Sequence, residues 1–174
     1  MDLFDLPASV LPEAAYRSAV ESPFARAQRR VREVIQAGHP ICLAFSAGKD
    51  SSALANIVLC TAAELRAAGD AVPPIIVVNS DTGVDQPEVV TLAGSELAKM
   101  QRFAKEHDLP VRTMRGSPAL TDSFAVRVIG GRGLPSFPDT RADCSNDWKI
   151  KVNEKLLKQA IKDCGRRGGR PLWS

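Results

Sequence analysis

Eight consecutive residues combine small, hydroxyl-bearing and charged side chains: Phe45-Ser46-Ala47-Gly48-Lys49-Asp50-Ser51-Ser52. Small residues let backbone N–H groups approach an anion closely, and the start of a helix adds partial positive charge. Lys49 would supply a mobile positive charge to phosphate oxygens, and the three serines would supply hydroxyl groups. Asp50 could cap the helix or help to hold Mg²⁺. The run is therefore predicted to bind phosphate, with a merely capped helix as the alternative.

A second polar run reads Asn79-Ser80-Asp81-Thr82-Gly83-Val84-Asp85-Gln86-Pro87-Glu88. Asp81 and Thr82 can reach a nucleotide or its metal ion, and Pro87 suits the first turn of a helix. Asp50 and Asp81 are accordingly the candidate metal ligands. The Asp-Thr-Gly sequence at 81–83 is also compatible with an ordinary turn.

Both runs depend on the elements around them. Segments typical of buried strands lie at 40–45, 74–79 and 109–114, and helical periodicity occupies 23–38, 51–68 and 87–107. This alternation predicts an α/β fold, a parallel Rossmann-like sheet flanked by helices. Because ligands of such folds bind at the carboxyl ends of the strands, we expect both polar runs at one edge of the sheet.

The remaining segments are less regular. Residues 1–22 are interpreted as an N-terminal arm and 23–174 as a single domain. Past residue 117 we expect a helical stretch at 121–129, a glycine-rich loop at 130–135 and a helix carrying an apolar stripe up to Cys164. Residues 170–174 look like the opening of a further strand, so we expect the domain to be truncated there.

The charge distribution and the composition indicate which classes of partner the protein could bind. The net charge is +3, but residues 141–174 hold nine Lys and Arg against four Asp and Glu, whereas the first 140 residues hold 14 against 16. A basic final segment suits a polyanion such as nucleic acid, and it is equally compatible with a solvated helix face. No apolar run is long enough to span a bilayer and no basic leader begins the chain, so a cytoplasmic protein without a membrane partner is expected.

The first run resembles the SGGKDS loop of the PP-loop ATP pyrophosphatases, with Ala47 in place of the second glycine. If that position needs a positive φ, alanine costs about 1 kcal/mol there. The Asp81-Thr82-Gly83 run, followed by Pro87-Glu88, resembles a signature of the phosphoadenosine-phosphosulfate (PAPS) reductase family. The pattern SF…IGGRG.P…CS…KIK between residues 123 and 151 is similar to that of the DndC and SspD proteins of DNA phosphorothioate modification, which replace a non-bridging phosphate oxygen of DNA with sulfur.

The resemblance implies an adenine nucleotide alpha hydrolase-like fold and an ATP pyrophosphatase that releases AMP and pyrophosphate. It implies catalytic roles for Lys49, Asp50 and Ser51. The implied nucleotide- and phosphate-binding residues are Ser46, Ala47, Gly48, Lys49, Ser51, Ser52, Asp81, Thr82, Gly83, Arg132, Arg141, Lys149 and Lys151. Its implied cofactors and partners are ATP, Mg²⁺, DNA, a cysteine desulfurase and other phosphorothioation proteins. A surface lattice of ion pairs is the alternative for the four basic residues from Arg132 to Lys151.

Two features limit the resemblance. The four cysteines are widely spaced, only Cys144 lies in the region that carries the [4Fe–4S] cysteines of DndC relatives, and Cys42, Cys60 and Cys164 are predicted to be core residues. We therefore expect no complete iron–sulfur cluster from this chain. A sulfonucleotide reductase is the second hypothesis, although the ECG motif of that family is absent, and an inert nucleotide-binding protein is the third.

Overall fold

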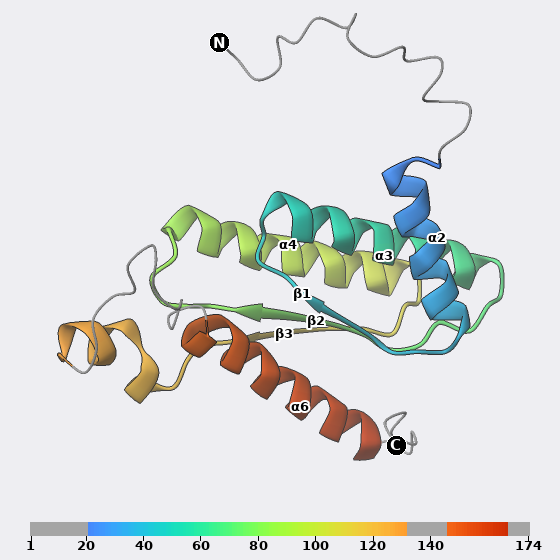
Figure 1. Ribbon diagram of the computed structural model, residues 1–174. Helices are drawn as coiled ribbons and strands as arrows, with labels where there is room; N and C mark the ends of the chain where they lie inside the picture. The colour runs from blue at the N-terminus through green and yellow to red at the C-terminus, as the bar shows by residue number, and fades with distance from the viewer. Residues whose placement is uncertain (1–20, 132–145, 167–174) are drawn as a thin grey trace, which may run out of the picture.

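Three parallel strands, in the order β1-β2-β3, make up the sheet. The computed structural model describes residues 21–131 and 146–166, and places β1 at Ile41–Ala44, β2 at Ile75–Ser80 and β3 at Val111–Gly116. Ile41 pairs with Ile75, which pairs in turn with Val111 on the other side. All three strands therefore begin level, and their carboxyl ends meet at one edge (Figure 1). The predicted parallel α/β class is confirmed.

Helices cover both faces of the sheet. The two connecting helices, α3 (Lys49–Ala67) and α4 (Pro87–Glu106), lie on one face with α2 (Pro23–Gln36) beside α3, and α6 (Lys151–Arg166) lies on the opposite face (Figure 1). The bounds of the three strands and of α2, α3 and α4 agree with those predicted to within two residues.

Local chemistry explains several of these bounds. The Ser22 hydroxyl accepts a hydrogen bond from the Ala25 N–H at 3.1 Å, and Pro23 follows in the first turn of α2, where its missing N–H costs nothing. Pro87 opens α4 in the same way. Gly38 has φ +77°, a conformation that favours glycine, and it ends the first helical segment as predicted.

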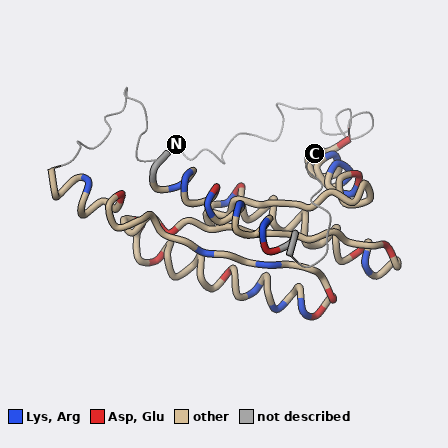
Figure 2. Tube along the Cα trace, turned by 90° about the horizontal axis from the view of Figure 1, so that it is seen from below, with Lys and Arg blue, Asp and Glu red and all other residues tan. Residues whose placement is uncertain are grey.

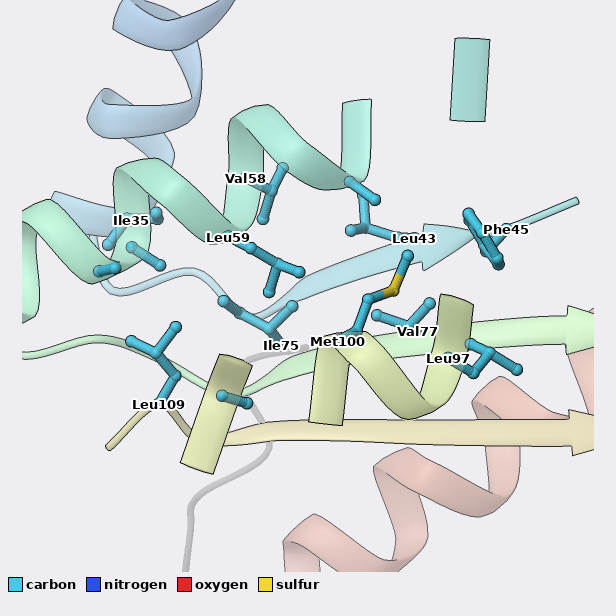
Figure 3. Packing of buried hydrophobic residues seen from close by; sticks show 14 of the residues in the cluster. Ile35, Leu43, Phe45, Val58, Leu59, Ile75, Val77, Leu97, Met100 and Leu109 are labelled. Atoms are coloured by element: carbon cyan, nitrogen blue, oxygen red, sulfur yellow. The ribbon is translucent and has the colours of Figure 1, made fainter. Parts of the chain in front are cut away.

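Two apolar clusters hold the layers together. The larger one joins α2, α3 and α4 to the sheet through side chains such as Ile35, Val58, Ile75, Val77 and Met100 (Figure 3). The smaller one, on the other face, consists of Ile76, Val78, Val152, Leu156 and Ala160, with Met114 packed against it. Because β2 faces both clusters, all but the last of its residues are buried.

Strand β1 differs from its prediction. We expected 40–45 to be buried on both faces, but Cys42 and Ala44 are exposed and Leu43 is the buried residue of the strand. The reason is tertiary, because α6 packs mainly against β2 and β3 and leaves the adjacent face of β1 uncovered.

The segment after β3 contains short helices. A 3-10 helix, η1, spans Leu120–Asp122, and single π-helical turns span η2 (Ala125–Ile129) and η3 (Asn146–Ile150). Trp148 of η3 donates from Nε1 to the carbonyl of Asp122 at 2.6 Å, and its ring meets that of Phe124 edge-on at 5.7 Å. These contacts join η3 to the segment after β3 and position the start of α6.

In the described part of the chain, no helix combines the length and apolar character that crossing a membrane requires.

Candidate functional site

The loop between β1 and α3 has an unusual backbone. Ala47 has φ +60°, in the left-handed region where an L side chain is strained by about 1 kcal/mol. The resemblance to the SGGKDS loop, which has glycine at this position, had raised a positive φ here as a condition, and the structure has it. Gly48 is the N-cap of α3, and a Cβ there would lie 3.3 Å from the Ser46 Oγ, so a larger residue would crowd the loop.

Serine hydroxyls close this loop on itself. The Ser51 Oγ donates to the Gly48 carbonyl at 3.0 Å and lies 3.1 Å from the Ser46 Oγ. It also accepts from the Ser46 N–H at 3.3 Å, while the Gly48 N–H donates to the Ser46 Oγ at 3.4 Å. The loop is thus held by its own side chains in the shape that leads the chain from β1 into α3.

The N-terminus of α3 lacks a side-chain cap. Gly48 offers no capping hydrogen bond, so the first N–H groups of this 19-residue helix, at Lys49, Asp50 and Ser51, point toward the sheet edge without helical partners. Asp50 lies in the first turn and is not the cap, which removes one of its two predicted roles. Lys49 and Asp50 are both exposed. An uncapped helix start of this kind favours a bound anion.

The loop after β2 lies beside the first one. Asp81 accepts from the Gly83 N–H through Oδ1 at 3.1 Å and pairs through Oδ2 with an Arg115 guanidinium nitrogen at 2.9 Å. Thr82 is only 3% exposed, and its hydroxyl donates to Asp85 at 2.7 Å. Thr82 therefore stabilises the loop, while Asp81 joins the loop to the end of β3 through Arg115.

A cavity of about 300 Å³ opens where these loops meet α4 and the start of α6. Its lining residues are Ala44, Phe45, Ser46, Asn79, Ser80, Asp81, Asp85, Val89, Val90, Ala93, Arg115, Lys149 and Asn153. The fold thus brings together Ser46, Asp81 and Lys149 of the predicted site, from three parts of the chain separated by more than thirty residues each.

Other predicted residues lie elsewhere. Nine predicted residues do not line the cavity, although they are close in sequence to residues that do. They are Ala47, Gly48, Lys49, Asp50, Ser51, Ser52, Thr82, Gly83 and Lys151. Arg132, Arg141 and Cys144 lie outside the described residues.

Asn79 begins the second polar run, but the sequence reasoning gave it no role of its own. It is 4% exposed, and its Nδ2 donates to the Phe45 carbonyl at 2.7 Å, which ties the end of β2 to the end of β1. Its Oδ1 has no hydrogen-bond partner among the described residues, and neither does the Oδ1 of Asn153 on the same cavity wall. A buried acceptor left unpaired costs about 1–3 kcal/mol, so the cavity has two positions suited to a donor group of a ligand. The sequence signal that could have identified Asn79 as a site residue was its position as a polar residue at the end of an apolar strand.

Asp85 lies in the second polar run but was given no role, and Arg115 was not among the predicted site residues. Arg115 is the last residue but one of β3, close to the strand end, just as the two polar runs follow β1 and β2, so the strand-end position was the signal for it. Together with Lys149 it gives the cavity two cationic side chains beside the carboxylates of Asp81 and Asp85, and Arg115 is ion-paired with Asp81.

Two of the predicted core cysteines are exposed. Cys42 lies on the uncovered face of β1, and Cys60 lies on α3 with its thiol donating to Asn56 at 3.0 Å. The prediction was wrong for both because it took apolar surroundings in sequence for burial. The side chain of Cys164 lies outside the description.

No family model matches this chain, and a search of curated proteins gives no match.

Proposed function

We propose that the protein is a PP-loop ATP pyrophosphatase related to the PAPS reductase-like DndC and SspD proteins. One observation carries the proposal: a small-residue loop with Ala47 at φ +60° leads from a parallel strand into an uncapped helix, beside a cavity at the carboxyl edge that polar and apolar side chains line together. This is the place where α/β sheets bind ligands. The loop amides and Lys49 would hold the β- and γ-phosphates, and the cavity would take the rest of the nucleotide.

Charge in the cavity supports a nucleotide. Lys149 can neutralise phosphate oxygens, and Arg115 can do so where a ligand replaces its ion pair with Asp81. The unpaired Oδ1 atoms of Asn79 and Asn153 can accept from amino or hydroxyl donors of a base or ribose. The apolar side chains Val89, Val90 and Ala93 of α4 line the same cavity and suit the flat face of a base.

Among the described residues, no group of three or more His, Cys, Asp or Glu is arranged to hold a metal ion. Mg²⁺ delivered with ATP needs no such group, because that ion commonly uses one or two carboxylates plus substrate phosphates and water. Asp81 would be its protein ligand, with Asp50 near the loop as the second candidate. When bound, Mg²⁺ would offset the negative charge of the leaving pyrophosphate.

The proposed reaction is a displacement at the α-phosphorus of ATP. An oxygen nucleophile forms a bond to the α-phosphorus, the bond from that phosphorus to the bridging oxygen breaks, and pyrophosphate leaves. The protein contributes positioning and charge stabilisation, with Lys49 and the α3 amides aimed at the leaving group. In our proposal the nucleophile is a DNA backbone oxygen in the cytoplasm, and water takes its place when DNA is absent, which gives AMP directly. A cysteine-desulfurase partner supplies a persulfide whose outer sulfur bonds to the DNA phosphorus, while AMP leaves with the adenylated oxygen. A thiol reductant then cleaves the S–S bond to the desulfurase, which leaves the sulfur on the DNA.

The test is product analysis with Mg-ATP, with and without DNA, for the native chain and for Lys49→Ala. We expect AMP and pyrophosphate without DNA and faster release of pyrophosphate with DNA. For the variant we expect a loss of at least about 100-fold in pyrophosphate release, the usual effect of removing one charge-stabilising donor. Lys99→Ala, an exposed lysine on α4, is the matched control and should leave the rate unchanged.

The alternatives give different products. Release of ADP and phosphate, or an unchanged rate in Lys49→Ala, would contradict the adenylation mechanism. Reduction of a sulfonucleotide by an added thiol donor would instead indicate a reductase. A rise in melting temperature with ATP and no turnover would indicate an inert nucleotide-binding protein.

A further inference from the structure

Helix α6 carries a straight row of lysines that the nucleotide site does not use. The row consists of Lys151, Lys155, Lys158 and Lys162, and all four are exposed. Their spacing of four, three and four residues confines them to about 60° of the helix circumference at ~100° per residue. Figure 2, seen from the side of the sheet that α6 covers, shows basic positions recurring along this helix.

The orientation of α6 is set by its apolar side. Val152, Leu156 and Ala160 are buried against β2 and β3, which turns the lysine row toward solvent. With its apolar side already occupied, α6 lacks the free hydrophobic face that membrane-surface helices insert into lipid.

Acidic neighbours offset only part of this charge. Asp163 is paired with Arg112 of β3 at 2.8 Å, and Glu154 lies 3.6 Å from Lys158. Within residues 21–131 and 146–166, Lys155 and Lys162 have no ion-pair partner. The positive charge of these two lysines is therefore available to a partner along the helix axis.

We propose that this row, the α6 lysine surface, binds the phosphate backbone of a nucleic acid. At ~1.5 Å per residue the row is about 16 Å long, which is more than a single nucleotide needs and enough for several consecutive phosphates. Its first residue follows Lys149, which lines the cavity, so a strand bound along α6 leads to the candidate active site. The inference rests on the proposed function for the choice of nucleic acid as the polyanion.

The test uses the full chain carrying Lys155→Gln, Lys158→Gln and Lys162→Gln together. Binding of a labelled DNA duplex is followed by fluorescence anisotropy over a series of KCl concentrations. We expect affinity at low salt to fall at least tenfold and the slope of log K against log salt to become shallower by up to about 2.7, since each lost phosphate contact removes about 0.9.

Two further variants make the result specific. Lys99→Gln, Arg102→Gln and Lys105→Gln remove the same charge from exposed positions of α4, on the opposite side of the sheet, and should change affinity by less than twofold. The triple Lys→Arg variant at 155, 158 and 162 should bind as tightly as the native chain, because it retains the charge.

The outcomes separate this inference from the proposed function. AMP release from Mg-ATP without DNA should be equal in the native chain and in the α6 glutamine variant. A native chain that binds DNA through α6 but releases no AMP would contradict the proposed function and support the surface. The proposed nucleic-acid-binding role of the α6 lysine surface would be contradicted by unchanged affinity in the α6 variant or by an equal loss of affinity in both glutamine variants. It would also be contradicted if poly-glutamate or anionic vesicles bound as tightly as DNA through the same lysines.

Discussion

Ala47 is the residue at which local strain and candidate function coincide. Its φ of +60° is imposed by the path from β1 into α3, where the Ser46 and Ser51 hydroxyls close the loop. A strained residue at a potential ligand loop persists only where the surrounding structure determines its conformation. Here that surrounding structure is the hydrogen-bonded loop itself.

Replacing Ala47 by glycine should raise the free energy of unfolding by about 1 kcal/mol, because glycine adopts a positive φ without a Cβ penalty. Urea denaturation measures the change. Ala53→Gly, at an exposed position inside α3, should have the opposite sign and cost about 0.5–1 kcal/mol. If both substitutions destabilise to the same extent, position 47 is not left-handed in solution.

At the same scale, Thr61 carries a buried hydroxyl group. It is fully buried in α3, and its hydroxyl has no hydrogen-bond partner among the described residues. Thr61→Val keeps the shape and removes the unpaired group, so it should stabilise the protein by about 1 kcal/mol in the same urea experiment. Thr91→Val on α4 is the control, because the Thr91 hydroxyl donates to the Pro87 carbonyl at 2.9 Å and gains nothing by removal. A destabilised Thr61→Val would mean that the hydroxyl is bonded.

At the scale of elements, helix α2 is attached to α3 partly through an ion pair. Arg32 pairs with Glu64 of α3 at 2.6 Å, while Arg29 joins Glu21 and Glu33. Bonds from Arg30, and then Arg29, hold the pKa of Glu33 below its ordinary value of 4.5. These groups are exposed, so each pair contributes little, but the contribution has a definite pH dependence.

A depressed carboxylate pKa adds stability that is present above the unfolded value and is lost as the pH falls through the folded value. Glu33→Gln should therefore lower the melting temperature slightly at pH 6 and have a smaller effect at pH 3. Scanning calorimetry at both values measures the difference. Glu106→Gln on α4, which breaks no ion pair among the described residues, should show no such pH-dependent change. An equal effect of Glu33→Gln at both pH values would contradict the ion-pair explanation.

At the scale of the whole molecule, the sheet is covered unevenly. Helices α3 and α4 span one face, whereas α6 covers mainly β2 and β3 on the other (Figure 1). The exposed side chains of Cys42 and Ala44 mark the uncovered part.

Cys42 gives a direct chemical test of that arrangement. Its surroundings desolvate the thiol and raise the pKa of Cys42 above the ordinary 9.0, so the reactive thiolate is scarce near neutral pH. In a Cys60→Ser variant, iodoacetamide should label Cys42 in the native protein at a rate that still increases above pH 9, as read by peptide mass spectrometry. Labelling confined to urea-unfolded protein would show that this face of β1 is covered.

Strand and helix positions were predictable from sequence because they depend on local periodicity and turn chemistry. The apolar run before Asn79 and the Pro87 start of α4 are signals carried within a few residues. The placement of two polar runs at one sheet edge also followed, because parallel strands align their carboxyl ends. Burial of Cys42 and Cys60 was mispredicted, because burial depends on which helix covers which strand.

The amino-acid sequence alone determined the α/β class, the bounds of its main elements and the position of the small-residue run 45–52 between β1 and α3. Only the tertiary structure brought Asn79, Arg115 and Lys149 to one cavity and turned the lysines of α6 outward. The physical reason is distance along the chain. Local propensity acts over a few residues, whereas a cavity wall is made by packing between segments far apart in sequence, and that packing is decided by the fit of whole faces.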